Sequence, residues 1–198
     1  MFSPQTMLLV FAASLFVVLP TQAQTVEQEK IVDLKEGDRA PHFTGVTDEG
    51  EEWDSREHAK KKHFIVYFYP ADMTGGCTAQ ACAYRDALAE LERDDVEVIG
   101  ISGDTVENHQ HFKQQYKLNF TLLADPKGEI AKAFGVKTGP GGSFEKMIGD
   151  ANVTFERGIT ANRWTFVINK KWEIAHVDRE VDAAKDSEKT LKIVEKLP

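Results

Sequence analysis

The chain contains two cysteines, Cys77 and Cys82, which lie five residues apart where an apolar, strand-like stretch passes into a helical one. A thiolate is a strong nucleophile, and a second thiol nearby gives it a partner for disulfide formation. At the start of a helix a thiolate is stabilised by the positive end of the helix dipole and by nearby N–H groups. This spacing therefore predicts thiol redox chemistry at Cys77.

Three other side chains suit a reactive thiol at this position. Thr74 carries a hydroxyl three residues before Cys77, where it could bond to the thiolate or to a bound oxygen atom. Pro70 ends the preceding strand and would shield the pocket. Arg163, at the start of a later strand, is a candidate for the cation that holds the thiolate. The pair Gly75-Gly76 lets the backbone approach closely at the turn into the helix.

The elements that would position these residues alternate between strands and helices. This order favours a thioredoxin-like α/β fold: a central mixed β-sheet flanked by helices, mostly parallel, with an N-terminal β-hairpin and an antiparallel closing hairpin. The expected strands are 43–46, 51–53, 63–69, 96–102, 120–123, 163–169 and 172–177, the expected helices are 78–94, 105–117, 128–134 and 182–197, and a glycine-rich loop is expected at 139–143.

A permanent disulfide between Cys77 and Cys82 is the first alternative to redox chemistry. In a helix, five residues separate two Cα atoms by about 8.5 Å, whereas a disulfide needs roughly 7 Å or less. A folded helix therefore cannot hold the bond. Either the segment is not helical, or the disulfide forms only after the helix unwinds locally.

Metal binding is the second alternative, and the number and spacing of the possible ligands make it unfavourable. Two cysteines are fewer ligands than a structural zinc site needs. His109 and His111 could join them, but residues two apart on a helix face different ways. We interpret both histidines as solvated side chains of a polar helix, and we expect no metal and no cofactor.

The N-terminus predicts export of the chain. Met7–Leu19 is an apolar run of thirteen residues, shorter than the roughly twenty that a membrane span needs, and it is followed by small residues at Thr21 and Ala23. This pattern is typical of a signal peptide at 1–23, cleaved after Ala23, although no Lys or Arg precedes the apolar run. An uncleaved membrane anchor is the alternative. Either way the domain at 35–198 would be periplasmic or secreted, without stable membrane contact once the signal is cleaved.

The charge of the chain limits its partners. The formal net charge is -8 and the isoelectric point is about 5.3. An acidic protein of this kind is poorly suited to bind nucleic acid or anionic membranes.

A family resemblance becomes specific around the two cysteines. The chain over residues 35–198 resembles the Q-type peroxiredoxins, also called bacterioferritin comigratory proteins. One departure is Gly75, because members usually carry Pro-Gly before the cysteine. The segments that carry the resemblance are Phe68-Tyr69-Pro70-x-x-x-Thr74-x-x-Cys77-Thr78-x-Gln80-x-Cys82, Arg85-Asp86, Gly37-Asp38-x-Ala40-Pro41-x-Phe43, Ile99–Ser102, Leu123–Pro126, Ala133–Val136 and Arg163-x-Thr165–Ile168.

The resemblance implies a thiol-dependent peroxidase. Cys77 would attack hydrogen peroxide or an organic hydroperoxide and become a sulfenic acid. Thr74 and Arg163 would hold the peroxide oxygens, and Pro70 would keep water away. Cys82 would resolve the sulfenic acid as an intramolecular disulfide, and a thioredoxin-like or other dithiol reductant would recycle it, with the protein expected to be a monomer.

Two other functions stay open from the residues alone. Export and two nearby thiols also suit a copper chaperone on a thioredoxin fold, although such proteins typically use a closer cysteine pair. A thiol–disulfide exchange protein is the third possibility, and it would be expected to use Cys-x-x-Cys, which this sequence lacks.

Overall fold

The computed structural model describes residues 32–59, 61–91 and 94–198. The chain divides into the units Met1–Lys30 and Ile31–Pro198, and all described elements belong to the second unit. The signal peptide predicted at 1–23 lies outside the described residues.

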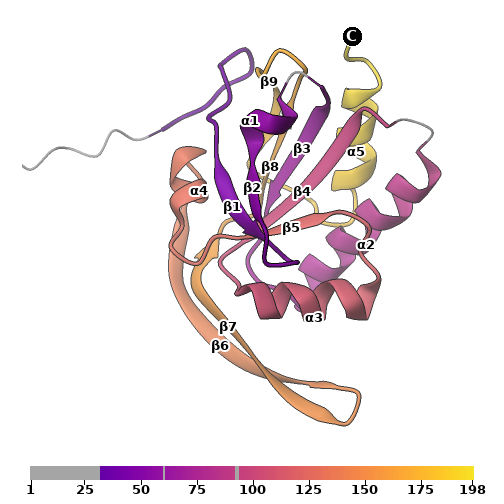
Figure 1. Ribbon diagram of the computed structural model, residues 1–198. Helices are drawn as coiled ribbons and strands as arrows, with labels where there is room; N and C mark the ends of the chain where they lie inside the picture. Colours follow the sequence, from indigo (N-terminus) through magenta and orange to yellow (C-terminus); the bar gives the residue numbers. More distant parts are fainter. Residues whose placement is uncertain (1–31, 60, 92–93) are drawn as a thin grey trace, which may run out of the picture. The chain divides into compact units, whose positions relative to one another are not determined.

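A seven-stranded sheet in the order β2-β1-β5-β4-β3-β8-β9 forms the centre of the Ile31–Pro198 unit (Figure 1). Strands β3, β4 and β5 are parallel, and the other pairings are antiparallel. The predicted mixed sheet and thioredoxin-like fold are therefore confirmed, but fewer strands are parallel than the sequence indicated. The strands are β1 Thr44–Thr47, β2 Glu52–Asp54, β3 His63–Phe68, β4 Val96–Ser102, β5 Thr121–Ala124, β8 Trp164–Ile168 and β9 Ile174–Asp178.

Helices cover both faces of this sheet, and β3 is therefore buried on both sides. Alternate side chains of a strand point to opposite faces. Phe64, Val66 and Phe68 pack in one apolar cluster with residues of α4, whereas Ile65 and Tyr67 pack in a second cluster with residues of α2, α3 and α5. The helices are α1 Ser55–His58, α2 Gly75–Glu90, α3 Val106–Tyr116, α4 Glu129–Ala133 and α5 Asp186–Val194.

Helix α2 begins three residues earlier than the sequence predicts. Thr74 is extended, with φ -85° and ψ 150°, and the helix starts at Gly75. Cys77 therefore lies inside the first turn of α2. The helix ends at Glu90 rather than at Asp94. Helix α3 lies where the helix 105–117 is expected. Thr105 caps it by accepting a hydrogen bond from the Asn108 backbone nitrogen at 3.2 Å.

The glycine-rich loop predicted at 139–143 is wrong, because this segment is part of a long β-hairpin. Strands β6 (Thr138–Ile148) and β7 (Ala151–Ala161) form a separate two-stranded sheet. A β-carbon on Gly141 would lie 2.2 Å from the Arg157 carbonyl oxygen, so glycine allows the two strands to approach there. The glycines thus serve close strand pairing rather than a flexible loop.

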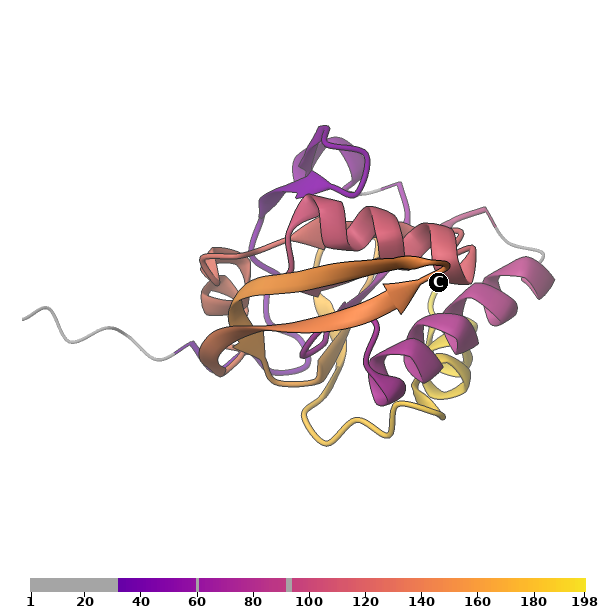
Figure 2. The same ribbon diagram turned by 90° about the horizontal axis from the view of Figure 1, so that it is seen from below.

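The β6–β7 hairpin runs along α3 (Figure 2). Phe155 of β7 is fully buried and lies edge-to-face with His111 of α3, with ring centroids 6.0 Å apart. The Asn108 side chain donates a hydrogen bond of 2.7 Å to the Glu156 carbonyl oxygen. These contacts fix the hairpin to the same face of the sheet as α2 and α3.

Candidate active site

The end of β3 and the start of β8 bring the two parts of the site together. These strands are antiparallel, with Phe68 opposite Trp164. Arg163, immediately before β8, therefore stands at the edge of the sheet where β3 ends and the loop to α2 begins. The pairing of β3 with β8 explains how Cys77 and Arg163, 86 positions apart, reach one site.

Arg163 contacts Cys77 directly. Its Nη2 atom donates to the Cys77 Sγ atom at 3.2 Å, and its Nη1 atom donates to the Gln80 Oε1 atom at 2.5 Å. Cys77 is 2% exposed. A β-carbon on Gly76 would lie 3.5 Å from Arg163 Nη2, an ordinary van der Waals distance, so the guanidinium packs directly beside the helix start. The guanidinium and the N–H groups of the first helical turn both place positive charge beside the sulfur.

Thr74 bonds to a neighbouring carbonyl group. Its Oγ1 atom donates to the Ala71 carbonyl oxygen at 2.9 Å and makes no capping hydrogen bond to α2. A hydroxyl that already donates its proton still has oxygen lone pairs that can accept one. Thr74 is therefore suited to accept the O–H of a bound hydroperoxide.

Cys82 lies on the same helix, about one and a half turns after Cys77, and both cysteines are free. Cys77 is buried and Cys82 is partly exposed. Because α2 is continuous from Gly75 to Glu90, helix geometry sets the two Cα atoms about 8.5 Å apart. A disulfide between them requires this helix to open.

Hydrogen bonds to buried polar groups hold the loop from Pro70 to Thr74 in place. Pro70 is half-buried and follows β3 after one residue, Tyr69. Asp72 accepts hydrogen bonds of 2.7 Å from the Tyr69 hydroxyl and the His109 ring, and its backbone nitrogen donates to Asp104 at 3.0 Å. The loop that carries Thr74 therefore has a fixed conformation.

The interpretation of His109 as a solvated side chain is wrong. His109 is fully buried and pairs with Asp72, which is buried as well. Burial disfavours the charged ring, but the charge and hydrogen bond of Asp72 outweigh it, so the pKa of His109 is raised. The polar neighbours of His109 in the sequence hid this role. His111 is half-buried against Phe155.

Lys146 links the hairpin to the site loop. Its Nζ atom donates to the Met73 carbonyl oxygen at 2.8 Å. Met73 is buried and has φ 60°, a left-handed conformation that is uncommon for a residue with a side chain. The hydrogen bond from β6 thus supports an unusual backbone conformation next to Thr74.

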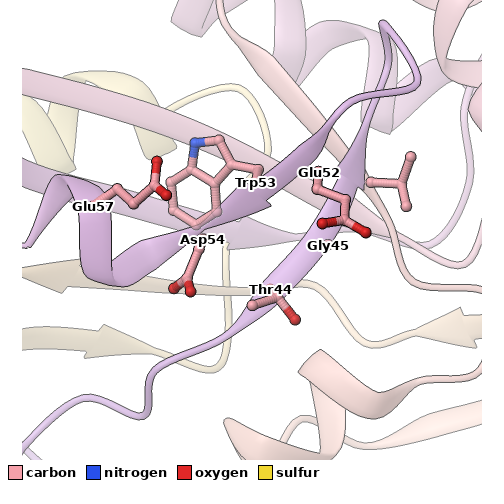
Figure 3. Close-up of a pocket in the computed structure, with 7 residues that line it drawn as sticks. Thr44, Gly45, Glu52, Trp53, Asp54 and Glu57 are labelled. Carbon is pink, nitrogen blue, oxygen red and sulfur yellow. The ribbon is translucent and has the colours of Figure 1, made fainter.

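A separate hollow of about 380 Å³ lies beside β1 and the edge strand β2, away from the cysteines (Figure 3). It is lined by Thr44 to Val46 of β1 and by acidic side chains of β2 and α1, and it contains neither cysteine. Glu52, Asp54 and Glu57 line the hollow from two elements. Among the described residues, no group of three His, Cys, Asp or Glu side chains is arranged to hold a metal ion.

Sequence reasoning assigned no role to Gln80 or Asp186. Gln80 is fully buried, and its Nε2 atom donates to the Asp186 Oδ2 atom at 2.6 Å. The position of Gln80 about one turn after Cys77 was the available signal. Asp186 gave none, because 106 residues separate it from Gln80 in the chain.

A buried cysteine in the first turn of a helix, held by an arginine on a thioredoxin-like sheet, defines a thiol-based redox protein. The family model of the AhpC/TSA family matches residues 36–177. The chain belongs to this family, among the peroxiredoxins named Q or bcp.

Two relatives illustrate this membership. The putative peroxiredoxin bcp of Coxiella burnetii is 41% identical over 136 residues, which cover 67% of this chain and 89% of the relative. The chloroplastic peroxiredoxin Q of Triticum aestivum is 34% identical over 188 residues, covering 93% and 79%. The enzyme class expected from the sequence, a peroxiredoxin, is thereby confirmed.

Solved structures agree with the fold. Peroxidoxin BcpB of Mycobacterium tuberculosis is 25% identical with a TM-score of 0.69, covering 84% of this chain and 99% of that chain. The bacterioferritin comigratory protein of Xanthomonas campestris is 24% identical and shares the fold, with a TM-score of 0.63 and coverage of 77% and 90%.

Proposed function

We propose that this protein reduces hydrogen peroxide and organic hydroperoxides with Cys77 as the attacking thiol. The observation that carries the proposal is the 3.2 Å contact from Arg163 to the Cys77 sulfur in the first turn of α2. In the first step the thiolate sulfur attacks one peroxide oxygen. An S–O bond forms, the O–O bond breaks, and the leaving oxygen takes a proton to become water or an alcohol, while Cys77 becomes a sulfenic acid.

Arg163 and Thr74 orient the peroxide in this step. Arg163 donates toward the oxygens on which negative charge develops, and Thr74 accepts the peroxide O–H. Pro70 covers the pocket and limits the access of water. Donors fixed before the reaction stabilise the developing charge without rearranging during it.

Cys82 then resolves the sulfenic acid. Its thiolate attacks the Cys77 sulfur, an S–S bond forms, and the hydroxyl of the sulfenic acid leaves as water after taking a proton. Both thiols belong to one helix of one chain, so the step needs no second subunit, in keeping with a monomer. A dithiol protein restores the two thiols by exchange and becomes oxidised itself.

The location of the protein forms part of the proposal. The apolar run at Met7–Leu19 suggests export, with cleavage after Ala23. The reductant would then be a thioredoxin-like or other dithiol protein of the same exported compartment. No specific observation favours the copper-handling or general thiol-exchange alternatives.

Peptide mapping after a peroxide pulse tests the proposed cycle. Reduced protein mixed with one equivalent of hydrogen peroxide should lose two thiols and yield one peptide pair joined by a Cys77–Cys82 disulfide. The same sample should lose amide-exchange protection in residues 78–84 as the helix opens. Consumption of peroxide with both thiols intact, or unchanged protection in the oxidised protein, would contradict the cycle.

Gly75→Pro should slow resolution without slowing the attack on peroxide. Gly75 is the first residue of α2, where proline is favoured, and Thr74 already has the extended conformation that precedes proline. A β-carbon added at Gly75 would meet no atom within 4 Å. Proline should stabilise the folded helix start by about 0.4–1 kcal/mol.

The measurement is rapid mixing with peroxide followed by quenching, with sulfenic acid and disulfide quantified separately. The disulfide should form about 2- to 5-fold more slowly in Gly75→Pro, as this stabilisation implies. Gly75→Ala, which restricts the backbone less, serves as the control with a smaller effect. Equal or faster disulfide formation in the proline variant would show that opening does not begin at the helix start.

A further inference from the structure

Asp186 is a buried carboxylate that gathers hydrogen bonds from two other elements. Its Oδ2 atom accepts from Gln80 Nε2 at 2.6 Å, from the Tyr84 hydroxyl at 2.7 Å and from Thr165 Oγ1 at 2.8 Å. Asp186 is 2% exposed and lies in the first turn of α5. One side chain thus connects α5 with α2 and β8.

The chemistry of its neighbours fixes the orientation of the Gln80 amide. An ionised carboxylate can only accept hydrogen bonds, and a guanidinium can only donate them. Gln80 lies between the two, with Nε2 at 2.6 Å from Asp186 and Oε1 at 2.5 Å from Arg163 Nη1. The amide must therefore direct its NH₂ group to Asp186 and its oxygen to Arg163.

This orientation in turn positions the guanidinium group. The guanidinium group of Arg163 is rigid and planar, so the hydrogen bond from Nη1 to Gln80 also sets the direction of Nη2. Nη2 is the atom that reaches the Cys77 sulfur at 3.2 Å. A continuous line of hydrogen bonds therefore runs from Asp186 through Gln80 and Arg163 to the reacting sulfur.

We propose that Asp186 is a positioning residue for peroxide reduction, which orients Arg163 on Cys77 through the Gln80 amide. The inference rests on the proposed role of Cys77. Tyr84 and Thr165 hold the carboxylate in place but do not contact Arg163 in this line of bonds. Their loss weakens the attachment of α5 without reversing the polarity of the Gln80 amide.

Asp186→Asn tests the proposal, because asparagine can turn either its oxygen or its NH₂ group toward Gln80. When the NH₂ group of asparagine faces Gln80, either two donors meet or the Gln80 amide turns and presents its own NH₂ group to Arg163, which cannot accept it. We expect the second-order rate constant with hydrogen peroxide to fall about 10-fold, and the alkylation of Cys77 by iodoacetamide to slow in parallel.

The exchange variant Gln80→Glu/Asp186→Asn provides the sharper test. The introduced glutamate accepts from Arg163, and the NH₂ group of the introduced asparagine donates to that glutamate. Arg163 still donates to residue 80, and only the hydrogen bond between residues 80 and 186 has its donor and acceptor exchanged. The double variant should recover the wild-type rate constant to within about 3-fold. Because it keeps the hydrogen bonds of this line, it should fold even if Asp186→Asn does not.

Thr165→Val and Tyr84→Phe are the matched controls, since each removes one donor to the same Asp186 oxygen. Both should lower the urea midpoint of unfolding while leaving the peroxide rate constant within about 2-fold of wild type. A wild-type rate constant and alkylation rate in Asp186→Asn would overturn the proposal, and so would a double variant that folds but stays slow. If wild-type Cys77 itself fails to react with peroxide, the proposed function fails instead.

Discussion

Cys77→Ser protein is expected to consume hydrogen peroxide no faster than buffer that contains dithiothreitol as the reductant. Serine keeps the size and place of the side chain in the first turn of α2, but its hydroxyl stays protonated even beside Arg163. A protonated hydroxyl is a far weaker nucleophile than a thiolate, so the loss should reach roughly 10³-fold or more. The measurement is peroxide consumption at fixed protein and dithiothreitol concentrations.

The fold of the serine variant must be shown to be intact for this result to be informative. Cys77 is buried in a cluster with Ile65 and Met73, so a hydroxyl there changes the polarity of the packing. Circular dichroism and urea unfolding of the variant serve as the control. Full peroxidase activity in a folded Cys77→Ser protein would show that another group attacks the peroxide.

Arg163→Met has the second largest expected effect, a fall of about 10²–10³-fold in the rate constant with peroxide. Methionine fills a similar volume but removes both hydrogen bonds, the one of 3.2 Å to Cys77 and the one of 2.5 Å to Gln80. Alkylation of Cys77 by iodoacetamide should slow as well, because the thiolate loses its cation. The rate constant of Arg163→Lys should lie between those of wild type and Arg163→Met. An ammonium group cannot donate to both Cys77 and Gln80 as the planar guanidinium group does.

Arg157→Met is the matched control for this prediction. Arg157 is also half-buried, but it lies on β7 and donates to Thr160 at 2.8 Å. Its loss removes one positive charge from the protein without touching the line of hydrogen bonds to Cys77. Equal losses of activity in the Arg157 and Arg163 variants would mean that net charge, rather than the contact with sulfur, sets the rate.

Several elements could be predicted from the sequence because their patterns are local. The apolar run at 63–69 has no alternation, and β3 is indeed buried on both faces. Strand β4 has the predicted bounds, and Thr105 caps α3. The helix expected at 128–134 corresponds to α4, and Gly135 follows its C-terminal end with φ 71°.

Tertiary contacts determine what the sequence did not reveal. His109 lies on a helix with polar neighbours, and only the approach of Asp72 from the site loop makes it a buried pair. The glycines at 139–143 indicate a loop until their pairing with β7 is known. Asp186 reaches Gln80 across 106 residues, so no local pattern could have joined them.

Buried polar groups near Cys77 are the main addition that the structure makes to the sequence reasoning. The His109–Asp72 pair supports the loop that carries Thr74, and Asp186 supports Arg163 through Gln80. Burial raises the pKa of Asp186, while the hydrogen bonds from Tyr84, Thr165 and Gln80 oppose that rise. Both supports place polar groups out of contact with water, and their hydrogen bonds to the site offset part of the cost of that burial.

The central claim is that Cys77 attacks the peroxide, and Cys82→Ser protein tests it most directly. The chain has two cysteines, so this variant has a single thiol. After rapid mixing with hydrogen peroxide and a sulfenic-acid trap, we expect one peroxide consumed per chain and one trapped adduct on Cys77. A Cys77 that reacts no faster than free cysteine, or that yields no adduct, would contradict the account.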